Sequence, residues 1–385
     1  MTQIAVKKEM LTWAREFRGL TIDEAAERLS LPAEDIVALE AGAPMNLTQF
    51  RRYANKLRIP LATFLRQTAP ETPPVPLDFR TYEGRPATLG FDARLAISYA
   101  YTIEQNILEL VETDAAPPTP VLPRLRLTED AAEAGERERR RLNVGHAAQI
   151  SWDTQSAFRT WRTVIEDAGA YVLQRKFELK DCKGFTIFRN PNAPIIMINK
   201  SEEFETAKIF TMAHEYAHLL LRQPGISDLN ERNPVEAFCN RFAAGFLMPR
   251  ALIRELLPYW PDHPIQWAFD DIARWARKLK VSQQALSLRL EQLGVAPVGF
   301  FQMLVSQQAH ANTRESAGGN AVSTQVSEIG YRFTRAVLNA EDEARISASE
   351  ASEMLDVAPK HFALIKDRLD QQFFNVNAGL GALPY

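Results

Sequence analysis

The stretch that most constrains this chain is Phe-Thr-Met-Ala-His-Glu-Tyr-Ala-His-Leu-Leu-Leu at positions 210–221. It contains neither proline nor glycine, so it predicts an uninterrupted helix. His214 and His218 are four residues apart, which places both imidazoles on one face of that helix, one turn from each other. Glu215 projects beside them. Two imidazoles can therefore reach a single metal ion, with a carboxylate directed at the water bound to that ion.

Apolar residues surround this motif on every side, so we expect the helix to be buried. The alternative is a hydrogen-bonded pair of core histidines without a metal. Three ionisable groups in a buried helix are costly unless they are paired or bound to a metal, which favours the metal site. We predict one zinc per chain. In such a site zinc acidifies a water molecule, and Glu215 takes its proton and passes it to a leaving amine.

Zinc in a catalytic site needs a third protein ligand and keeps a fourth position open. A metzincin would have glycine at position 221 and histidine at position 224, but the chain has Leu221 and Pro224, which excludes that class. We therefore expect a downstream carboxylate, and Glu236 is the best placed. Pro234 suits the first position of a second apolar helix that ends before Pro249, so Glu236 falls in its first turn.

Glu236 has a second interpretation, because with Asn233 as N-cap it also stands where a capping-box carboxylate would. Asn240 lies one turn further along the same face and is predicted to hydrogen-bond a metal ligand. We expect Cys239 to point to a different face and to be a small buried residue. The other candidates for the third ligand are Glu231, Glu255 and Cys239. The remaining histidines stand alone in polar or loop-like surroundings and are predicted to be surface residues: His146, His263, His310 and His361.

These residues give the chain a resemblance to the ImmA/IrrE family of metallopeptidases, whose pattern is His-Glu-x-x-His followed by Glu-x-x-x-Asn. The run Phe-Ala-Ala-Gly-Phe-Leu-Met-Pro at 242–249 extends the resemblance. It implies that His214, His218 and Glu236 bind zinc and that Glu215 is catalytic. It also implies a biological role, since members of the family often cleave helix-turn-helix repressors and thereby derepress genes.

Composition limits the class of protein. A chain of 385 residues, 46% hydrophobic and 24% charged, can bury two or three ordinary domains. It has no long apolar run and no signal sequence at its start, so we expect a cytoplasmic protein without membrane contact. Its two cysteines, Cys182 and Cys239, cannot form a disulfide framework. The net charge of -3 provides no global attraction to nucleic acid.

The first part of the chain, residues 5–66, predicts four or five short helices. Thr21 is a cap, with Glu24 three residues later, and a tight turn separates the second and third helices. This pattern resembles the Cro/CI-type helix-turn-helix domain. The helices are expected at 10–18, 21–29, 32–41, 48–57 and 61–65.

Whether this domain binds DNA is open at the level of sequence. Its third helix begins with Glu34 and Asp35 and has no lysine or arginine, although base reading usually requires Arg, Gln, Asn or Ser. A basic cluster on the following helix could contact phosphates, or it could be a solvated face. The rival role for the domain is docking of a protein. The candidate DNA-binding residues are Arg51, Arg52, Lys56 and Arg58.

Proline-rich breaks at 67–76 and 114–123 divide the chain. We predict a helix-turn-helix domain at 1–68, a linker and helical connector at 69–128, a peptidase domain at 129–305, and a helical C-terminal extension at 306–385. The charge block 137–141 is expected to be a solvated face. Outside the first domain and the metal region, helices are expected at 91–112, 129–142, 154–168, 264–279 and 282–293, and strands at 170–174, 184–189 and 194–199.

We therefore expect an α+β protein, mostly helical, with a gluzincin-like zinc-peptidase core and a small three-stranded sheet. The expected function is a zinc-dependent endopeptidase that cuts a regulatory protein, a helix-turn-helix repressor above all, in a stress, phage or mobile-element response. The alternative is a DNA-binding or antitoxin-like regulator whose peptidase-like core is a sensing or structural metal site. Glu215 favours the enzyme, because a purely structural site does not require it. The C-terminal extension is expected to be a packing or dimerisation module, so a homodimer is a candidate state.

Overall fold

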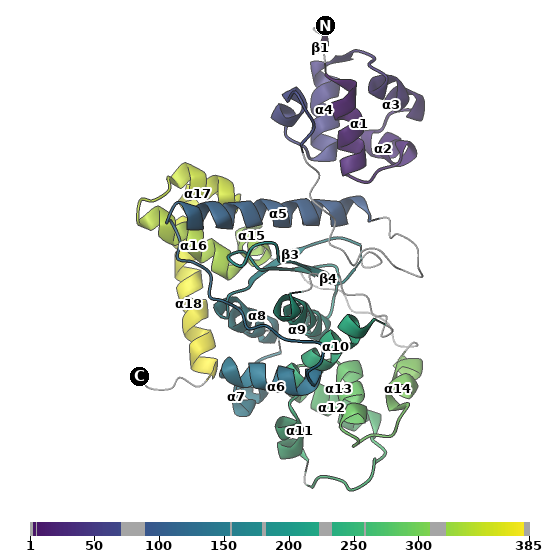
Figure 1. The fold of residues 1–385 in the computed structure, drawn as a ribbon, viewed down its shortest axis with the longest axis vertical. Coiled ribbons are helices and arrows are strands. Elements are labelled where there is room, and N and C mark those ends of the chain that lie inside the picture. Colours follow the sequence, from purple (N-terminus) through teal and green to yellow (C-terminus); the bar gives the residue numbers. More distant parts are fainter. Residues whose placement is uncertain are drawn as a thin grey trace. The chain divides into compact units, whose positions relative to one another are not determined.

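The computed structural model describes residues 3–4, 6–70, 89–154, 156–178, 182–222, 233–257, 259–308 and 321–380. This part of the chain is α+β and mostly helical (Figure 1). It divides into two compact units, the first made of 1–75, 79–101 and 176–181 and the second of 76–78, 102–175 and 182–385. The boundary falls inside the long helix α5 (Phe91–Glu112). No helix among the described residues is long and apolar enough to cross a membrane.

The first unit is a small helical bundle. Its elements are α1 (Lys8–Phe17), α2 (Ile22–Leu29), α3 (Ala33–Glu40), α4 (Leu47–Leu57) and the 3-10 helix η1 (Leu61–Leu65). The expected cap is present, because the Thr21 side chain accepts from the backbone N–H of Glu24 and the Glu24 carboxylate accepts from that of Thr21. Two short strands that were not expected, β1 (Gln3–Ile4) and β2 (Met45–Asn46), pair antiparallel in this unit.

The second unit is built on a three-stranded sheet of β3 (Tyr171–Arg175), β4 (Gly184–Ile187) and β5 (Ile195–Asn199). The strand order is β3-β5-β4, with β3 parallel and β4 antiparallel to β5. All five residues of β5 are buried, and an Ile-Ile-Met-Ile run is typical of a central strand covered on both faces. A small sheet of three strands was expected before the metal helix, and it is confirmed.

Helices α8 (Ala157–Asp167) and α9 (Glu205–Leu221) pack on this sheet, and α10 (Pro234–Leu247) lies against α9 (Figure 1). From Lys208 to Leu221 nearly every side chain of α9 is buried. One core cluster joins these helices, with Trp161 from α8, Tyr216 from α9 and Phe242 from α10 among its members. The motif helix is therefore held on all sides, as its apolar surroundings predicted.

Helix α6 (Ala131–Arg141) lies directly on α10, and glycines allow this close approach. A Cβ on Gly135 would lie 2.3 Å from the Phe242 carbonyl oxygen. The charge block at 137–141 was expected to be a solvated face, and for Arg139 that expectation was wrong. The Arg139 side chain is buried and donates to the carbonyls of Val144 and Phe246. Its guanidinium satisfies helix-end carbonyls that would otherwise be buried without partners.

Replacing Gly245 by alanine should destabilise the second unit. The added Cβ would lie 2.2 Å from the carbonyl oxygen of Ala132, so α6 and α10 would have to move apart. We expect a loss of about 1–3 kcal/mol in the free energy of unfolding, measured by denaturant titration. Gly145→Ala is the control, because no atom lies within 4 Å of its added Cβ. Equal losses in the two variants would contradict this packing.

The remaining helices complete the second unit: α7 (His146–Ser151), α11 (Arg250–Leu256), α12 (Phe269–Leu279), α13 (Gln283–Gln292), α14 (Phe300–Gln308), α15 (Ala321–Ile329), α16 (Tyr331–Asp342), α17 (Ala348–Leu355), η3 (Pro359–His361) and α18 (Phe362–Leu380). The helix expected at 264–279 begins only at Phe269. The segment before it is not helical, and the indole of Trp267 in that segment donates to the carbonyl of Val295. Glu328 near the end of α15 pairs with Arg175 and Lys200, so the C-terminal helices contact the ends of β3 and β5.

Candidate metal centre

The two motif histidines and Glu236 converge on one point between α9 and α10. The Nε2 atoms of His214 and His218 lie 3.1 Å apart. One oxygen of the Glu236 carboxylate lies 3.1 Å from Nε2 of His214, and the other lies 3.1 Å from Nε2 of His218. All three side chains are nearly inaccessible to solvent, with exposed fractions of 4%, 0% and 1%. Helical spacing on α9 supplies the two imidazoles, and the first turn of α10 supplies the carboxylate.

This donor set fits zinc. A tetrahedral zinc with bonds of about 2.0–2.1 Å holds its ligand atoms about 3.3 Å apart, close to the separations found here. Among the described residues, the two imidazoles are the groups within reach of the buried Glu236 oxygens, and no other hydrogen-bond partner is present. A buried carboxylate is costly unless positive charge lies beside it, which a metal ion between it and the imidazoles would supply. The cap of α10 is made by Asn233, whose side chain accepts from the backbone N–H of Val235, and the Glu236 carboxylate is directed at the imidazoles.

The charges of these groups favour a cation among them. Burial alone would raise the pKa of Glu236, but the two imidazoles outweigh it and lower that pKa to about 2. Burial also lowers the pKa of His214. For His218 burial acts in the same direction, but contacts with Cys239, Glu236 and Glu215 outweigh it and raise the pKa well above its usual value. The carboxylate is thus ionised, and positive charge beside it is stabilised.

Asn240 lies where the sequence predicted, with its side-chain oxygen 2.8 Å from Nδ1 of His214. That nitrogen is the one turned away from Glu236. A ligand histidine usually donates its outer N–H to a fixed acceptor, which sets the tautomer and aims the ring. Asn240 can therefore hold the His214 imidazole in the orientation that leaves Nε2 free for a metal.

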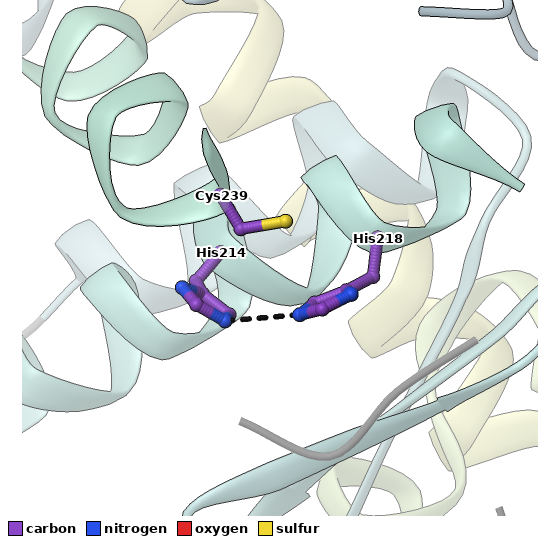
Figure 2. A group of neighbouring side chains, drawn as sticks. All are labelled: His214, His218 and Cys239. Atoms are coloured by element: carbon purple, nitrogen blue, oxygen red, sulfur yellow. Dashed lines mark hydrogen bonds between the residues drawn. The ribbon is translucent and has the colours of Figure 1, made fainter. Parts of the chain in front are cut away.

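Cys239 is not on a different face, and that expectation was wrong. Its Sγ and one ring nitrogen from each of His214 and His218 lie within 4.8 Å of one another (Figure 2). The reason is helical spacing, because Glu236, Cys239 and Asn240 stand at i, i+3 and i+4 and so share one side of α10. Burial raises the pKa of the Cys239 thiol, which makes it a poorer metal ligand than the ionised carboxylate of Glu236.

Glu215 is fully buried beside the histidines and packs against the first residue of β4. A Cβ on Gly184 would lie 3.2 Å from Cγ of Glu215 and 2.9 Å from both the Met197 carbonyl oxygen and Cγ2 of Thr211. A glycine at this place lets the strand approach the motif helix closely. The sequence had placed Gly184 at the start of a strand but gave no indication that it contacts Glu215.

The opposite side of the motif helix carries a polar anchor that the sequence did not reveal. The hydroxyl of Tyr216 donates to Glu138 of α6 at 2.6 Å, and Arg141 donates to both oxygens of that carboxylate. Tyr216 is fully buried. In a helix that is otherwise apolar on this side, a single satisfied polar contact can fix the rotation about the helix axis. The anchor therefore helps to direct His214 and His218.

The other sequence candidates lie elsewhere. Glu255 pairs with Nδ1 of His146 at 2.8 Å, and its side chain is 58% exposed. His263 is exposed and His361 is half-buried. Glu231 and His310 lie outside the described residues. The candidate DNA-binding residues are all exposed, three of them on α4 and the last at its C-cap: Arg51, Arg52, Lys56 and Arg58.

Residues 165–291 match the IrrE N-terminal-like domain, the Peptidase_M78 family. The matched region begins in α8 and contains the sheet, α9 and α10, and with them His214, Glu215, His218 and Glu236. The match supports the assignment of this region to the ImmA/IrrE family, and with it a role as a metallopeptidase. No curated protein matches the chain.

Proposed function

We propose that this protein is a zinc-dependent endopeptidase that cuts a regulatory protein. The observation that carries the proposal is the convergence of three buried side chains beside a buried Glu215. The Nε2 atoms of His214 and His218 lie 3.1 Å apart, and each lies 3.1 Å from a different oxygen of the Glu236 carboxylate. The match to a peptidase family over the same residues supports it. Zinc held there supplies a Lewis acid and an acidified water.

The roles of the protein's own groups follow from their positions. His214, His218 and Glu236 hold the metal, and Asn240 keeps His214 oriented. Glu215 accepts the proton of the attacking water and later gives it to the nitrogen of the leaving amine, so no covalent intermediate with the protein is needed. Burial of this carboxylate next to His218 excludes bulk water from the proton transfer.

The proposal extends to the rest of the chain. A Cro/CI-type helix-turn-helix domain at 1–68 is supported by α2, α3 and the tight turn between them. A connector at 69–128, the peptidase domain at 129–305 and a helical extension at 306–385 complete the organisation. The substrate class is a helix-turn-helix transcriptional repressor, so cleavage would derepress genes.

The test is a comparison of proteomes from cells that carry the wild type and cells that carry Glu215→Gln. Mapping of protein N-termini should find at least one new N-terminus, within a regulatory protein, that only the wild type produces. Glu205→Gln, which alters a partly exposed carboxylate in the same helix, is the matched control and should still produce it. Identical sets of N-termini in the wild-type and Glu215→Gln cells, under conditions that induce the gene response, would contradict the proposal.

A further inference from the structure

The side of α10 that faces the two motif histidines carries a second potential metal donor besides Glu236, the thiol of Cys239. Figure 2 shows this thiol directed at the imidazoles of His214 and His218. Its Sγ and one ring nitrogen of each imidazole lie within 4.8 Å of one another. The thiol is also close enough to His218 to form a hydrogen bond with it. The same two imidazoles therefore face two different donors, a hard carboxylate and a soft sulfur.

The placement of these three groups suits a metal ion. An ion bound to two imidazole nitrogens and one sulfur at about 2.0–2.3 Å holds the three atoms about 3.3–3.6 Å apart, so a small shift of the thiol completes the set. His214, His218 and Cys239 are all buried. Bulk water therefore does not compete with the sulfur for an ion between them.

A buried cysteine is often no more than a small apolar residue, and Cys182 provides the comparison. Cys182 is also buried, but it lies in the segment before β4 and belongs to no group of three potential ligands among the described residues. Cys239 differs because helical spacing places it beside a proposed zinc ligand, at i+3 from Glu236.

We propose that His214, His218 and Cys239 form an alternative site for a soft, thiophilic cation such as Cu⁺. Thiolate ligands favour Cu⁺, carboxylates suit harder ions, and imidazole binds both copper and zinc. Binding replaces the S–H bond of Cys239 by a sulfur–metal bond and releases one proton to solvent, with no change of oxidation state. Because zinc and the soft cation share both imidazoles, only one of them can be bound at a time.

The consequence for the proposed peptidase is inhibition, and this step rests on the proposed function. A cation on the Cys239 side loses the contact with Glu236. With a single positive charge it also acidifies a bound water far less than zinc does. A soft cation would therefore silence the enzyme by displacing zinc, without unfolding the protein.

The test is an anaerobic titration of the metal-free, full-length protein with Cu⁺ against a chromophoric Cu⁺ chelator, with a parallel titration of Zn²⁺. The wild type should bind one Cu⁺ per chain. Cys239→Ser should lower the Cu⁺ affinity by more than ~100-fold, because loss of a direct ligand exceeds the range typical of outer hydrogen-bond partners. The same variant should keep its zinc, which also shows that it is folded. Glu236→Gln should do the reverse and lose zinc while keeping Cu⁺.

Two further measurements make the assignment specific. Cys182→Ser is the matched control, since it removes the other buried thiol and should leave both affinities unchanged. X-ray absorption at the copper edge should show one sulfur ligand in the wild type and none in Cys239→Ser.

The inference would be overturned by a wild type that binds no Cu⁺, by equal Cu⁺ affinities in the wild type and Cys239→Ser, by equal losses in the two cysteine variants, or by a copper spectrum without sulfur. Loss of zinc together with Cu⁺ in Cys239→Ser would also overturn it, because the two ions would then share the thiol. These measurements need neither substrate nor cleavage. A protein that binds Cu⁺ in this way but cuts nothing would refute the proposed function alone, and one that cuts but ignores Cu⁺ would refute this inference alone.

Discussion

Alanine in place of His218 should strip this protein of its metal. We expect the purified wild type to hold about one zinc per chain and His218→Ala to lose most of it after dialysis. Nε2 of His218 lies 3.1 Å both from Nε2 of His214 and from a Glu236 oxygen, so its removal opens the ligand set. Loss of a direct ligand should lower zinc affinity by more than the roughly 10–100-fold typical of outer hydrogen-bond partners. Elemental analysis and competition with a chromophoric chelator measure both quantities.

Two comparisons sharpen this test. His263→Ala changes an exposed histidine away from α9 and should keep the metal, while Asn240→Ala should weaken binding by about 10–100-fold through the loss of its contact to His214.

The pair Glu236→Gln and Cys239→Ser identifies the third ligand. We expect the first to lose most of the affinity and the second to keep it. The reverse result would assign the ligand to Cys239, and unchanged zinc in both His214→Ala and His218→Ala would remove the site altogether.

The convergence of His214, His218 and Glu236 could be predicted from sequence because it depends on local spacing. One helical turn separates His214 from His218, and Pro234 marks the start of the helix that brings Glu236 into its first turn. The three strands before the motif were readable for the same reason, since β-branched runs between turn residues are a local signal. The longest helix outside the motif, α5, was predicted at its observed bounds of 91–112.

Features that depend on contacts between distant segments of the chain could not be predicted from the sequence. The β3-β5-β4 order requires a pairing across the chain that no strand specifies alone. Arg139 was assigned to solvent with its charged neighbours, yet it lies buried beside carbonyls from α10 more than a hundred residues later. The contact between Gly184 and Glu215 is of the same kind. Cys239 is different, because its side of α10 follows from the i+3 spacing and should have been inferred.

Glutamine in place of Glu215 should abolish proteolysis while leaving the metal in place. The amide keeps the size of the buried side chain but cannot accept a proton from water, so we expect the rate of cleavage to fall ~10²–10⁴-fold or more. The ligand atoms belong to other residues, so zinc content and the unfolding midpoint should stay near those of the wild type. The measurement is kcat/KM on the regulatory protein identified by N-terminus mapping, with zinc content determined on the same samples.

The contrast between Glu215→Gln and Glu236→Gln separates the two carboxylates by role. Both are buried within the same site, and both changes remove one negative charge. If Glu215 is the proton acceptor and Glu236 a ligand, added zinc should restore activity at least in part to Glu236→Gln and not at all to Glu215→Gln. Full activity of Glu215→Gln on the verified substrate would refute the mechanism, because the proton of the attacking water would then have to go to another group.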